Sequence, residues 1–561
     1  MWNALLSAPL RMLVRQVTRG NPAIYSRPLG APAARFLSAS VDGGSTAKKT
    51  EPVPAEAPAS AGPKEPVRTS AKQYAEDFLT VTDRLEFDLV VIGSGPAGQK
   101  AAINAAKNGK RVVVIDKGTS LGGVYVHTGT VPSKTFREAI VHFTGVKSKG
   151  FMSEYSKEIA NLSMGDIMQR VITVGQWQSQ VVQSQLGRND VQIMNGAARF
   201  LDPHHIEVLS SEDTVRRRVV RAANVLISVG TKPVRPDGWS DLFDGESIFD
   251  SDQILSDRWK LPRDMIVVGG GIIGLEYASM FNTLPGTRVT VIDGRPELLS
   301  FVDADVTGAL MYIMRKQGAN FKLGDSVVNV ERIVDPTSGR KRIHVYLSSG
   351  RRVHGDNLLY AVGRVGNVSG LGLETLGIVP NKRGLLDVDA NYRTSVPHIY
   401  AAGDVIGFPA LASTSMEQGR EASNIMFGFK RPRGSRKEFT VLPYGIYTCP
   451  EISMVGKTEN QLIQAKIPYE VGYAKFEELA KAHILNEREG FLKVMFCPDE
   501  PHTLYGAAII GHLSTELIHI GQAVLAHEGN VHYFVEGITN APTFSELFRI
   551  AAFDGLNRTR D

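Results

Sequence analysis

The chain has 561 residues, of which 43% are hydrophobic and 22% charged, as in a soluble globular protein of roughly three to four domains. No apolar run approaches the ~20 residues of a membrane-spanning helix, so we expect no membrane insertion. The net charge of +5 comes from five arginines in residues 1–41, which contain no lysine and no acid. The rest of the chain is neutral, which argues against nucleic acid as a partner.

Residues 1–41 have the arginine-rich, serine-containing, acid-free composition of an organelle-targeting segment. A helix here would be basic on one side and apolar on another, because arginine recurs every four residues from Arg11 to Arg19. We therefore expect a mitochondrial (matrix) protein with a plastid as the alternative, unless this composition arose by chance. Residues 42–85 are rich in proline, alanine and charge, which predicts a disordered linker.

The first motif that carries chemistry is a glycine-rich turn between a strand and a helix. The apolar segment 89–92 leads into Gly93-Ser94-Gly95-Pro96-Ala97-Gly98, and a second strand at 112–115 ends at Asp116. This is the G-x-G-x-x-G fingerprint of a dinucleotide-binding unit, with its acid at the required distance.

A second copy lies in the middle of the chain. Gly269, Gly271 and Gly274 follow another apolar strand, and Asp293 ends the next one. In each copy the glycines allow the backbone to approach a pyrophosphate, the helix N-terminus attracts that anion, and the acid accepts hydrogen bonds from a ribose. Two such sites imply two dinucleotides and electron transfer between them.

The chain resembles the pyridine nucleotide–disulfide oxidoreductases (class I) from about Phe87 to Asn557, and within them it is most similar to the FAD-dependent NAD(P)+ transhydrogenases. The resemblance rests on LGGVYVHTGTVPSK (121–134), LLYAVGRVGN (358–367), HIYAAGDVIGFPALAS (398–413), GIYTCPEISMVGKTE (445–459), ELIHIGQAV (516–524) and APTFSELFRIAAFDGLNR (541–558).

The resemblance implies that the first motif binds FAD and the second binds NAD(H) or NADP(H). Lys134 matches the family lysine beside flavin N5, and Glu276 matches the glutamate that pairs with it; these are the candidate catalytic residues. Asp404 matches the aspartate that binds the ribityl chain, and a helix beginning near Leu411 and Ala412 would point at the flavin. The expected FAD site comprises Gly93, Ser94, Gly95, Pro96, Ala97, Gly98, Asp116, Lys117, Gly122, Gly123, Tyr125, Thr130, Lys134, Gly230, Asp404, Leu411 and Ala412. The expected nicotinamide nucleotide site comprises Gly269, Gly271, Gly274, Asp293, Arg295 and Gly363.

The disulfide reductases of this family carry two cysteines beneath the flavin and a base histidine near the C-terminus. Here Tyr125 and Thr130 stand at the cysteine positions and Ala541 at the histidine position, while the glutamate that orients the base remains as Glu546. Neither Tyr125 nor Thr130 can form a disulfide, and Ala541 cannot accept a proton. Transhydrogenases of the family can keep one cysteine in this segment and an aromatic residue at the position of Ala541, so Tyr125 and Ala541 depart from them too.

These substitutions predict hydride transfer between NADPH and NAD+ through FAD, in a ping-pong cycle at one nicotinamide site, with the chemistry supplied by the cofactor. Asp293 suits the ribose 2′-hydroxyl of NAD, and Arg295 could bind the 2′-phosphate of NADP, or be a surface arginine of an NAD-specific enzyme. The alternatives are an NAD(P)H dehydrogenase that reduces a quinone or another external acceptor, and a flavin-binding structural subunit whose active site has decayed.

Four other residues carry less weight. His127 lies between the two substituted cysteine positions and is either structural or close to the flavin, and His519 is expected to pack in an interface. Cys449 and Cys497 are the only cysteines, which excludes a disulfide framework, and no cluster has metal-ligand spacing, so we expect no metal.

The expected fold class is α/β, with two doubly wound (Rossmann-like) dinucleotide-binding domains, one inserted in the other, and a C-terminal α+β dimerisation domain that forms a homodimer or higher homo-oligomer. The expected boundaries are FAD-binding residues 86–230 and 361–435, NAD(P)-binding residues 231–360 and dimerisation residues 436–561.

Overall fold

The computed structural model describes residues 85–118, 120–148, 163–209, 218–334, 339, 341–430 and 441–559. The predicted targeting segment 1–41 lies outside the described residues. So does the predicted linker 42–85, except that its last residue, Leu85, already belongs to the first strand.

The first sheet has a parallel core in the order β3–β2–β1–β6, and β17 also pairs in parallel with β6. An antiparallel hairpin, which the sequence did not predict, extends it beyond β6. The strand predicted at 89–92 is longer than expected because its pairing with β6 begins at Leu85. The strands are β1 (Leu85–Ile92), β2 (Val112–Asp116), β3 (Gln192–Asn195), β4 (Ala197–Phe200), β5 (His205–Leu209), β6 (Arg218–Ile227) and β17 (Ile399–Ala401).

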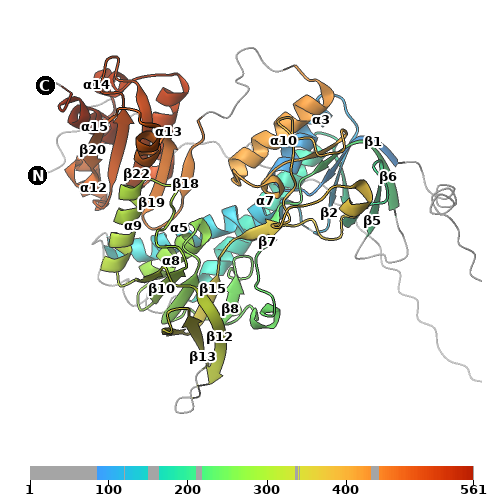
Figure 1. Cartoon of the computed structure of the whole chain (residues 1–561), viewed down its shortest axis with the longest axis horizontal. Helices are drawn as coiled ribbons and strands as arrows, with labels where there is room; N and C mark the ends of the chain where they lie inside the picture. Colours follow the sequence, from blue (N-terminus) through green and yellow to red (C-terminus); the bar gives the residue numbers. More distant parts are fainter. Residues whose placement is uncertain are drawn as a thin grey trace, which may run out of the picture. The chain divides into compact units, whose positions relative to one another are not determined.

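Helices from distant parts of the sequence accompany this sheet, and α3 and α10 lie side by side (Figure 1). A Cβ atom on Gly419 of α10 would lie 2.0 Å from the carbonyl oxygen of Ala97 on α3, so this contact requires a residue without a side chain. The helices are α3 (Pro96–Lys107), α4 (Gly123–His127), α5 (Thr130–Ser148), α7 (Met164–Gly187) and α10 (Ala412–Phe427), with short 3-10 turns η2 (Leu373–Leu376) and η3 (Asp404–Ile406).

The second sheet consists of five parallel strands in the order β11–β10–β9–β15–β8. A separate antiparallel sheet, β12–β13–β14, lies in the chain between strands β11 and β15 of the parallel sheet. The short strands β7 and β16 pair with each other where the chain enters and leaves this region. The elements are β7 (Thr231–Pro233), η1 (Ser240–Leu242), β8 (Ile248–Asp250), β9 (Asp264–Val268), α8 (Ile272–Thr283), β10 (Arg288–Asp293), α9 (Ala304–Lys316), β11 (Asn320–Leu323), β12 (Val327–Val334), β13 (Lys341–Leu347), β14 (Arg352–Gly355), β15 (Asn357–Tyr360) and β16 (Arg364–Gly366).

The C-terminal region is built on an antiparallel sheet in the order β18–β19–β22–β21–β20. Its elements are β18 (Tyr444–Ile446), β19 (Glu451–Gly456), α11 (Glu459–Ala465), β20 (Glu470–Lys475), η4 (Phe476–Glu478), α12 (Ala480–Leu485), β21 (Phe491–Phe496), β22 (Leu504–Gly511), α13 (Ser514–Ala526), α14 (His532–Glu536) and α15 (Glu546–Leu556). Among the described helices, none has both the length and the apolar character needed to cross a membrane.

One hydrophobic core joins the three regions and fixes the helix that carries Lys134. Phe136 of α5 is fully buried and packs with Phe281 of α8, their ring centroids 5.7 Å apart. Ile452 and Ile510 of the C-terminal sheet belong to the same cluster. Because close-packed interiors tolerate little movement, the first turns of α5 are held firmly against both neighbouring regions.

Candidate active site

The first glycine motif forms a turn that is tied to the acid at the end of the next strand. Gly93 has φ +102°, which favours glycine, and its N–H donates to the carbonyl oxygen of Ile115. The N–H of Ser94 donates to Oδ2 of Asp116 over 2.7 Å, and the N–H of Gly122 donates to Oγ of Ser94 over 2.9 Å. The motif and the predicted Gly122-Gly123 turn are thus parts of one hydrogen-bonded unit.

The second motif repeats this geometry. Gly269 has φ +108°, and its N–H donates to the carbonyl oxygen of Ile292. The N–H of Gly270 donates to Oδ2 of Asp293 over 2.6 Å, as Ser94 does to Asp116. The chain therefore builds the same turn twice, at the end of β1 and at the end of β9.

Both motifs leave room for a phosphate. The helices that begin there, α3 and α8, have Gly95 and Gly271 at their N-caps, and no side chain caps either helix. A Cβ atom on Gly95 or Gly271 would meet nothing within 4 Å, so open space lies over both sets of free N–H groups. Uncapped helix N-termini facing open space suit the pyrophosphates of two dinucleotides.

A cavity of about 1130 Å³ connects the predicted flavin end of one site with the second glycine motif. It is lined by twelve of the predicted site residues: Tyr125, Thr130, Lys134, Gly269, Gly271, Glu276, Asp293, Arg295, Gly363, Asp404, Leu411 and Ala412. The other predicted residues are not among its lining: Gly93, Ser94, Gly95, Pro96, Ala97, Gly98, Asp116, Lys117, Gly122, Gly123, Gly230 and Gly274. Two hydroxyl oxygens of lining residues, Thr128 Oγ1 and Tyr277 Oη, are buried and have no hydrogen-bond partner.

Lys134 and Glu276 form an ion pair in this cavity. The Lys134 ammonium lies 2.9 Å and 2.7 Å from the two carboxylate oxygens, and the Glu276 side chain is 5% exposed. The N–H of Tyr447 also donates to Glu276, and the Lys134 ammonium lies 4.8 Å from the centre of the Tyr447 ring. The pair thus joins α5, α8 and the segment after β18, and the C-terminal region fixes its geometry through Tyr447, which the sequence analysis did not select.

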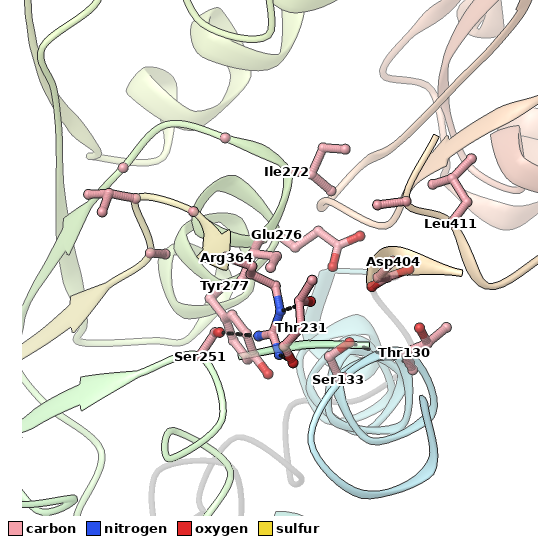
Figure 2. Close-up of a pocket in the computed structure, with 18 of the residues that line it drawn as sticks. Thr130, Ser133, Thr231, Ser251, Ile272, Glu276, Tyr277, Arg364, Asp404 and Leu411 are labelled. Carbon is pink, nitrogen blue, oxygen red and sulfur yellow. Dashed lines mark hydrogen bonds between the residues drawn. The ribbon is translucent and has the colours of Figure 1, made fainter. Parts of the chain in front are cut away.

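Asp404, the first residue of η3, lies in the same cavity (Figure 2). Its Oδ1 lies 3.3 Å from the hydroxyl of Ser415 on α10. Burial raises the pKa of this carboxyl, and the opposing effects of Arg364 and of the Ser415 and Thr231 hydroxyls do not cancel the increase. A half-buried carboxyl that faces a cavity is suited to hydrogen bonding with the hydroxyl groups of a ligand.

Arg364 is a residue of the site that sequence reasoning missed. Its guanidinium donates to Thr231, Ser251 and Asp252, and its side chain is 15% exposed (Figure 2). It therefore ties β7 and β16 to the segment after β8, at the place where the two parallel sheets connect. The sequence offered one indication of Arg364: it is a charged residue between two glycines in the stretch 361–367, directly after a buried strand.

Arg295 and Asp293, which also line the cavity, form a second ion pair. Arg295 Nε lies 2.9 Å from Asp293 Oδ1, and Nη2 lies 2.7 Å from Oδ2. Burial alone would raise the pKa of Asp293, but the hydrogen bonds from Arg295 and Gly270 outweigh it and lower the pKa. The hydrogen bond to Asp293 in turn raises the pKa of Arg295.

Tyr125, Thr130 and Ala541 stand at the positions where, by the predicted match, the disulfide reductases carry two cysteines and a histidine, and the structure places them in different surroundings. Tyr125 and Thr130 both line the cavity, from α4 and the start of α5. Ala541 is exposed in the single chain and is not among the lining residues. Glu546 accepts a hydrogen bond from the N–H of Thr543 and stabilises the first turn of α15, which is a structural role.

The remaining candidates divide between surface and core. His127 is exposed and outside the cavity lining, with its Nε2 3.0 Å from the Leu121 carbonyl oxygen. His519 lines the cavity but is exposed in the single chain, where it hydrogen-bonds to Gln522. Cys449 is buried, and burial raises the pKa of its thiol, which disfavours a reactive thiolate.

Two uncapped glycine turns, the second of which lines the cavity, are typical of an oxidoreductase that binds two dinucleotides. Residues 87–419 match the pyridine nucleotide-disulphide oxidoreductase family, and residues 442–552 match its dimerisation domain. The chain belongs to this family.

Its relatives include the soluble pyridine nucleotide transhydrogenase of Mycobacterium bovis, which is 43% identical over 85% of this chain and 98% of that protein. The enzyme of the same name from Yersinia enterocolitica is 40% identical over 84% of this chain and 98% of that protein. Among solved structures, LpdA from Mycobacterium tuberculosis is similar with a TM-score of 0.74 and 28% identity, over 84% of this chain and 99% of that chain.

Membership of the family confirms the α/β fold class with its Rossmann-like parallel sheets. It also confirms the expected cofactors, because the family depends on FAD and uses NAD(P)H. The expected mitochondrial location, with a plastid as the alternative, is wrong. The relatives named above are bacterial proteins, and they point to the cytoplasm instead. Arginine-rich composition alone misled the prediction.

Proposed function

We propose that this chain catalyses hydride transfer between NADPH and NAD+ with FAD as its cofactor. The observation that carries the proposal is the composition of the cavity wall. The wall holds the Lys134–Glu276 pair and the Arg295–Asp293 pair, but none of its described lining residues is a cysteine. A site that serves two dinucleotides without a thiol suits exchange between nucleotides. The relatives named transhydrogenases, at 40% and 43% identity, support the same function. They do not favour a quinone-reducing dehydrogenase or a decayed structural subunit.

The residues of the first glycine motif, together with Asp116 and Asp404, fit FAD. Bound FAD would supply the chemistry of hydride transfer between the two nicotinamide nucleotides. The uncapped N-terminus of α3, which begins after Gly95, would hold its pyrophosphate, because open space lies over Gly95. Asp116, held by the N–H of Ser94, would accept a hydrogen bond from its ribose. Asp404 would hydrogen-bond to the ribityl hydroxyls.

Lys134 and Glu276 place a fixed positive charge in the cavity. The Lys134 ammonium cannot leave the Glu276 carboxylate without cost, because the buried Glu276 would lose its partner. The N-terminus of α10, at Leu411 and Ala412, adds the positive end of a helix dipole to the same cavity. Both features favour negative charge on a bound ligand, and neither needs to transfer a proton.

We further propose that Tyr125 and Thr130 replace the two redox cysteines of the disulfide reductases, and that Ala541 replaces their base histidine. With these replacements the chain can neither form a protein disulfide nor protonate a thiol there. Dihydrolipoamide and glutathione are then excluded as substrates, while both dinucleotide sites are retained.

The proposal extends to the assembly. Residues 442–552 match a dimerisation domain, so we propose a homodimer, with FAD-binding residues 86–230 and 361–435, NAD(P)-binding residues 231–360 and dimerisation residues 436–561. The exposed positions of Ala541 and His519 in the single chain agree with a partner surface near the cavity.

An anaerobic assay with purified FAD-loaded protein, NADPH and the analogue thio-NAD+ tests the function. We expect formation of the reduced analogue at the rate at which NADPH is consumed. Turnover with a quinone but not with thio-NAD+ would contradict the proposal, as would rapid reduction of a lipoyl or glutathione disulfide. Protein that binds no FAD would contradict it as well.

A further inference from the structure

Three metal-ligating side chains meet in the C-terminal region, away from the cavity. They are Glu500 and His502, in the turn between β21 and β22, and His532, the first residue of α14. One ligand atom from each lies within 4.8 Å of the other two. The sequence analysis predicted no metal site because His532 is far from Glu500 and His502 along the chain, and the fold alone brings them together.

The spacing within this cluster matches a metal site better than a hydrogen-bonded one. The Nε2 atoms of His502 and His532 lie 3.3 Å and 3.5 Å from the two Glu500 oxygens. Charge-assisted hydrogen bonds are shorter, at about 2.7–2.9 Å. In a tetrahedral site with metal–ligand distances of about 2.0–2.1 Å, two neighbouring ligand atoms lie about 3.4 Å from each other. Because the widest separation is at most 4.8 Å, a small rotation of one imidazole closes the site.

The tautomer of His502 is fixed by its surroundings. Its Nδ1 lies 3.1 Å from the carbonyl oxygen of Cys497, and a carbonyl oxygen can only accept, so Nδ1 carries the proton. In the neutral ring, Nε2 then presents its lone pair to Glu500 and His532. The residue is 7% exposed and its ring packs edge-on against Phe496 at 5.9 Å, so the lone pair has a fixed direction. Metal-bound histidines are typically oriented in this way by a carbonyl on the second nitrogen.

The backbone holds the two segments together without an ion. Thr503 and Asn530 form an isolated β-bridge, and the N–H of Val531 donates to the His502 carbonyl oxygen over 3.2 Å. The N–H of His532 donates to the Asn530 side chain. The three ligands are therefore brought close before any ion binds.

We propose that Glu500, His502 and His532 bind a divalent transition-metal ion, with Zn²⁺ the best match to two imidazoles and one carboxylate. The exposed position of Glu500 leaves the fourth coordination position to water. None of the three residues lines the cavity, so the site is separate from the nucleotide sites. A bound ion would join the β21–β22 turn to the start of α14 and stabilise the folded C-terminal region.

The test uses the full-length FAD-loaded protein after removal of metals with a chelator. Co²⁺ serves as the optical probe, because its absorption reports tetrahedral coordination, and Zn²⁺ serves as the competitor. We expect one Co²⁺ per chain, displaced by Zn²⁺, and a higher melting temperature with Zn²⁺. His532→Ala should weaken binding at least as much as the about 10- to 100-fold that follows loss of a single orienting partner. It should also abolish the shift in melting temperature.

Two further variants keep the result interpretable. Glu500→Gln changes an exposed side chain and should also weaken binding, so a folding failure of His532→Ala would not leave the proposal untested. His483→Ala removes another histidine that hydrogen-bonds to a carbonyl oxygen, that of Glu477, outside the cluster, and should bind Co²⁺ like the wild type. Equal Co²⁺ binding by the wild type, His532→Ala and Glu500→Gln would overturn the proposal, as would a melting temperature that Zn²⁺ does not change.

Discussion

Arg295 donates two hydrogen bonds to the carboxylate of Asp293, the acid that ends the second dinucleotide-binding strand. The residue suited to a 2′-phosphate and the residue suited to a 2′-hydroxyl thus hold each other. We propose that either nucleotide must compete with this pair, so that one site serves both.

Replacing Arg295 with alanine should impair the use of NADPH far more than that of NADH. The Arg295→Ala change removes the cation and leaves the Asp293 carboxylate to repel the phosphate. A hydrogen bond to a charged group contributes about 1.5–3 kcal/mol, so KM for NADPH should rise about 10-fold or more. Steady-state kinetics with both nucleotides measures this. The matched control is Arg288→Ala, which removes an arginine paired with Asp264 at the other end of β10. Equal changes in both KM values would remove the phosphate role.

The same pair should be insensitive to pH over the working range. The pKa of Asp293 is lowered from its ordinary value of 3.8, so the carboxylate stays charged. Its contribution to folding is fully present above the unfolded pKa and is lost only as pH falls through the lower folded pKa. The ratio of KM values for NADPH and NADH should therefore show no titration of Asp293 between about pH 5 and 9. An inflection in that range that disappears in Asp293→Asn would contradict this assignment.

Lys134→Met should slow turnover without loss of FAD. Removing one oriented charge from an active site typically lowers kcat by about 10²- to 10³-fold. Glu276→Gln should have a smaller effect, because the amide can still accept the hydrogen bonds from Lys134 and Tyr447. Rapid-reaction measurements of cofactor reduction by NADPH report the rate, and flavin absorbance per chain reports FAD content. Lys107→Met, an exposed lysine at the end of α3, is the control. A normal rate in Lys134→Met would refute a catalytic role.

Two glycines of the second motif should respond differently to the same substitution. In Gly271→Ala the new Cβ meets nothing, so stability should be retained, while the methyl group occupies the space over the helix N-terminus and KM rises for both nucleotides. In Gly274→Ala the Cβ would lie 1.9 Å from the Gly269 carbonyl oxygen, so the turn must distort and the melting temperature should fall. Thermal melts and nucleotide titrations distinguish the two effects. A stable Gly271→Ala protein with unchanged affinity would show that no phosphate lies there.

Lys493 should be essential for stability. Its side chain is 0% exposed, and its ammonium contacts Asp303, Asp305 and Glu459, thereby linking α9 to the C-terminal sheet. Lys493→Met leaves Asp303, which is 1% exposed, without its partner, and breaking a buried pair costs about 3–5 kcal/mol. Lys475→Met, which removes an exposed pair with Glu477, should cost under about 1 kcal/mol. Denaturant unfolding measures both. Similar losses in the two variants would contradict the argument.

Local patterns in the sequence predicted the two glycine turns and the acids that close them, because these features depend on residues close together in the chain. The Lys134–Glu276 pair could be inferred only by resemblance, since its residues come from different helices. Arg364, Tyr447 and the Glu500–His502–His532 cluster were missed, because their partners are brought near only by tertiary packing. The antiparallel hairpin of β4 and β5 was missed for a related reason, as its pairing with β6 depends on the whole sheet. The location was predicted wrongly because composition does not identify the compartment of a protein.

The absence of cysteine from the described cavity wall has a consequence for the chemical environment that the protein tolerates. Cys449 is buried and has a raised pKa, so oxidants and alkylating reagents find little thiolate to attack there. A disulfide reductase stops when its paired cysteines are alkylated or overoxidised. We expect this enzyme to continue exchanging reducing equivalents between its two nucleotide pools after iodoacetamide or peroxide treatment.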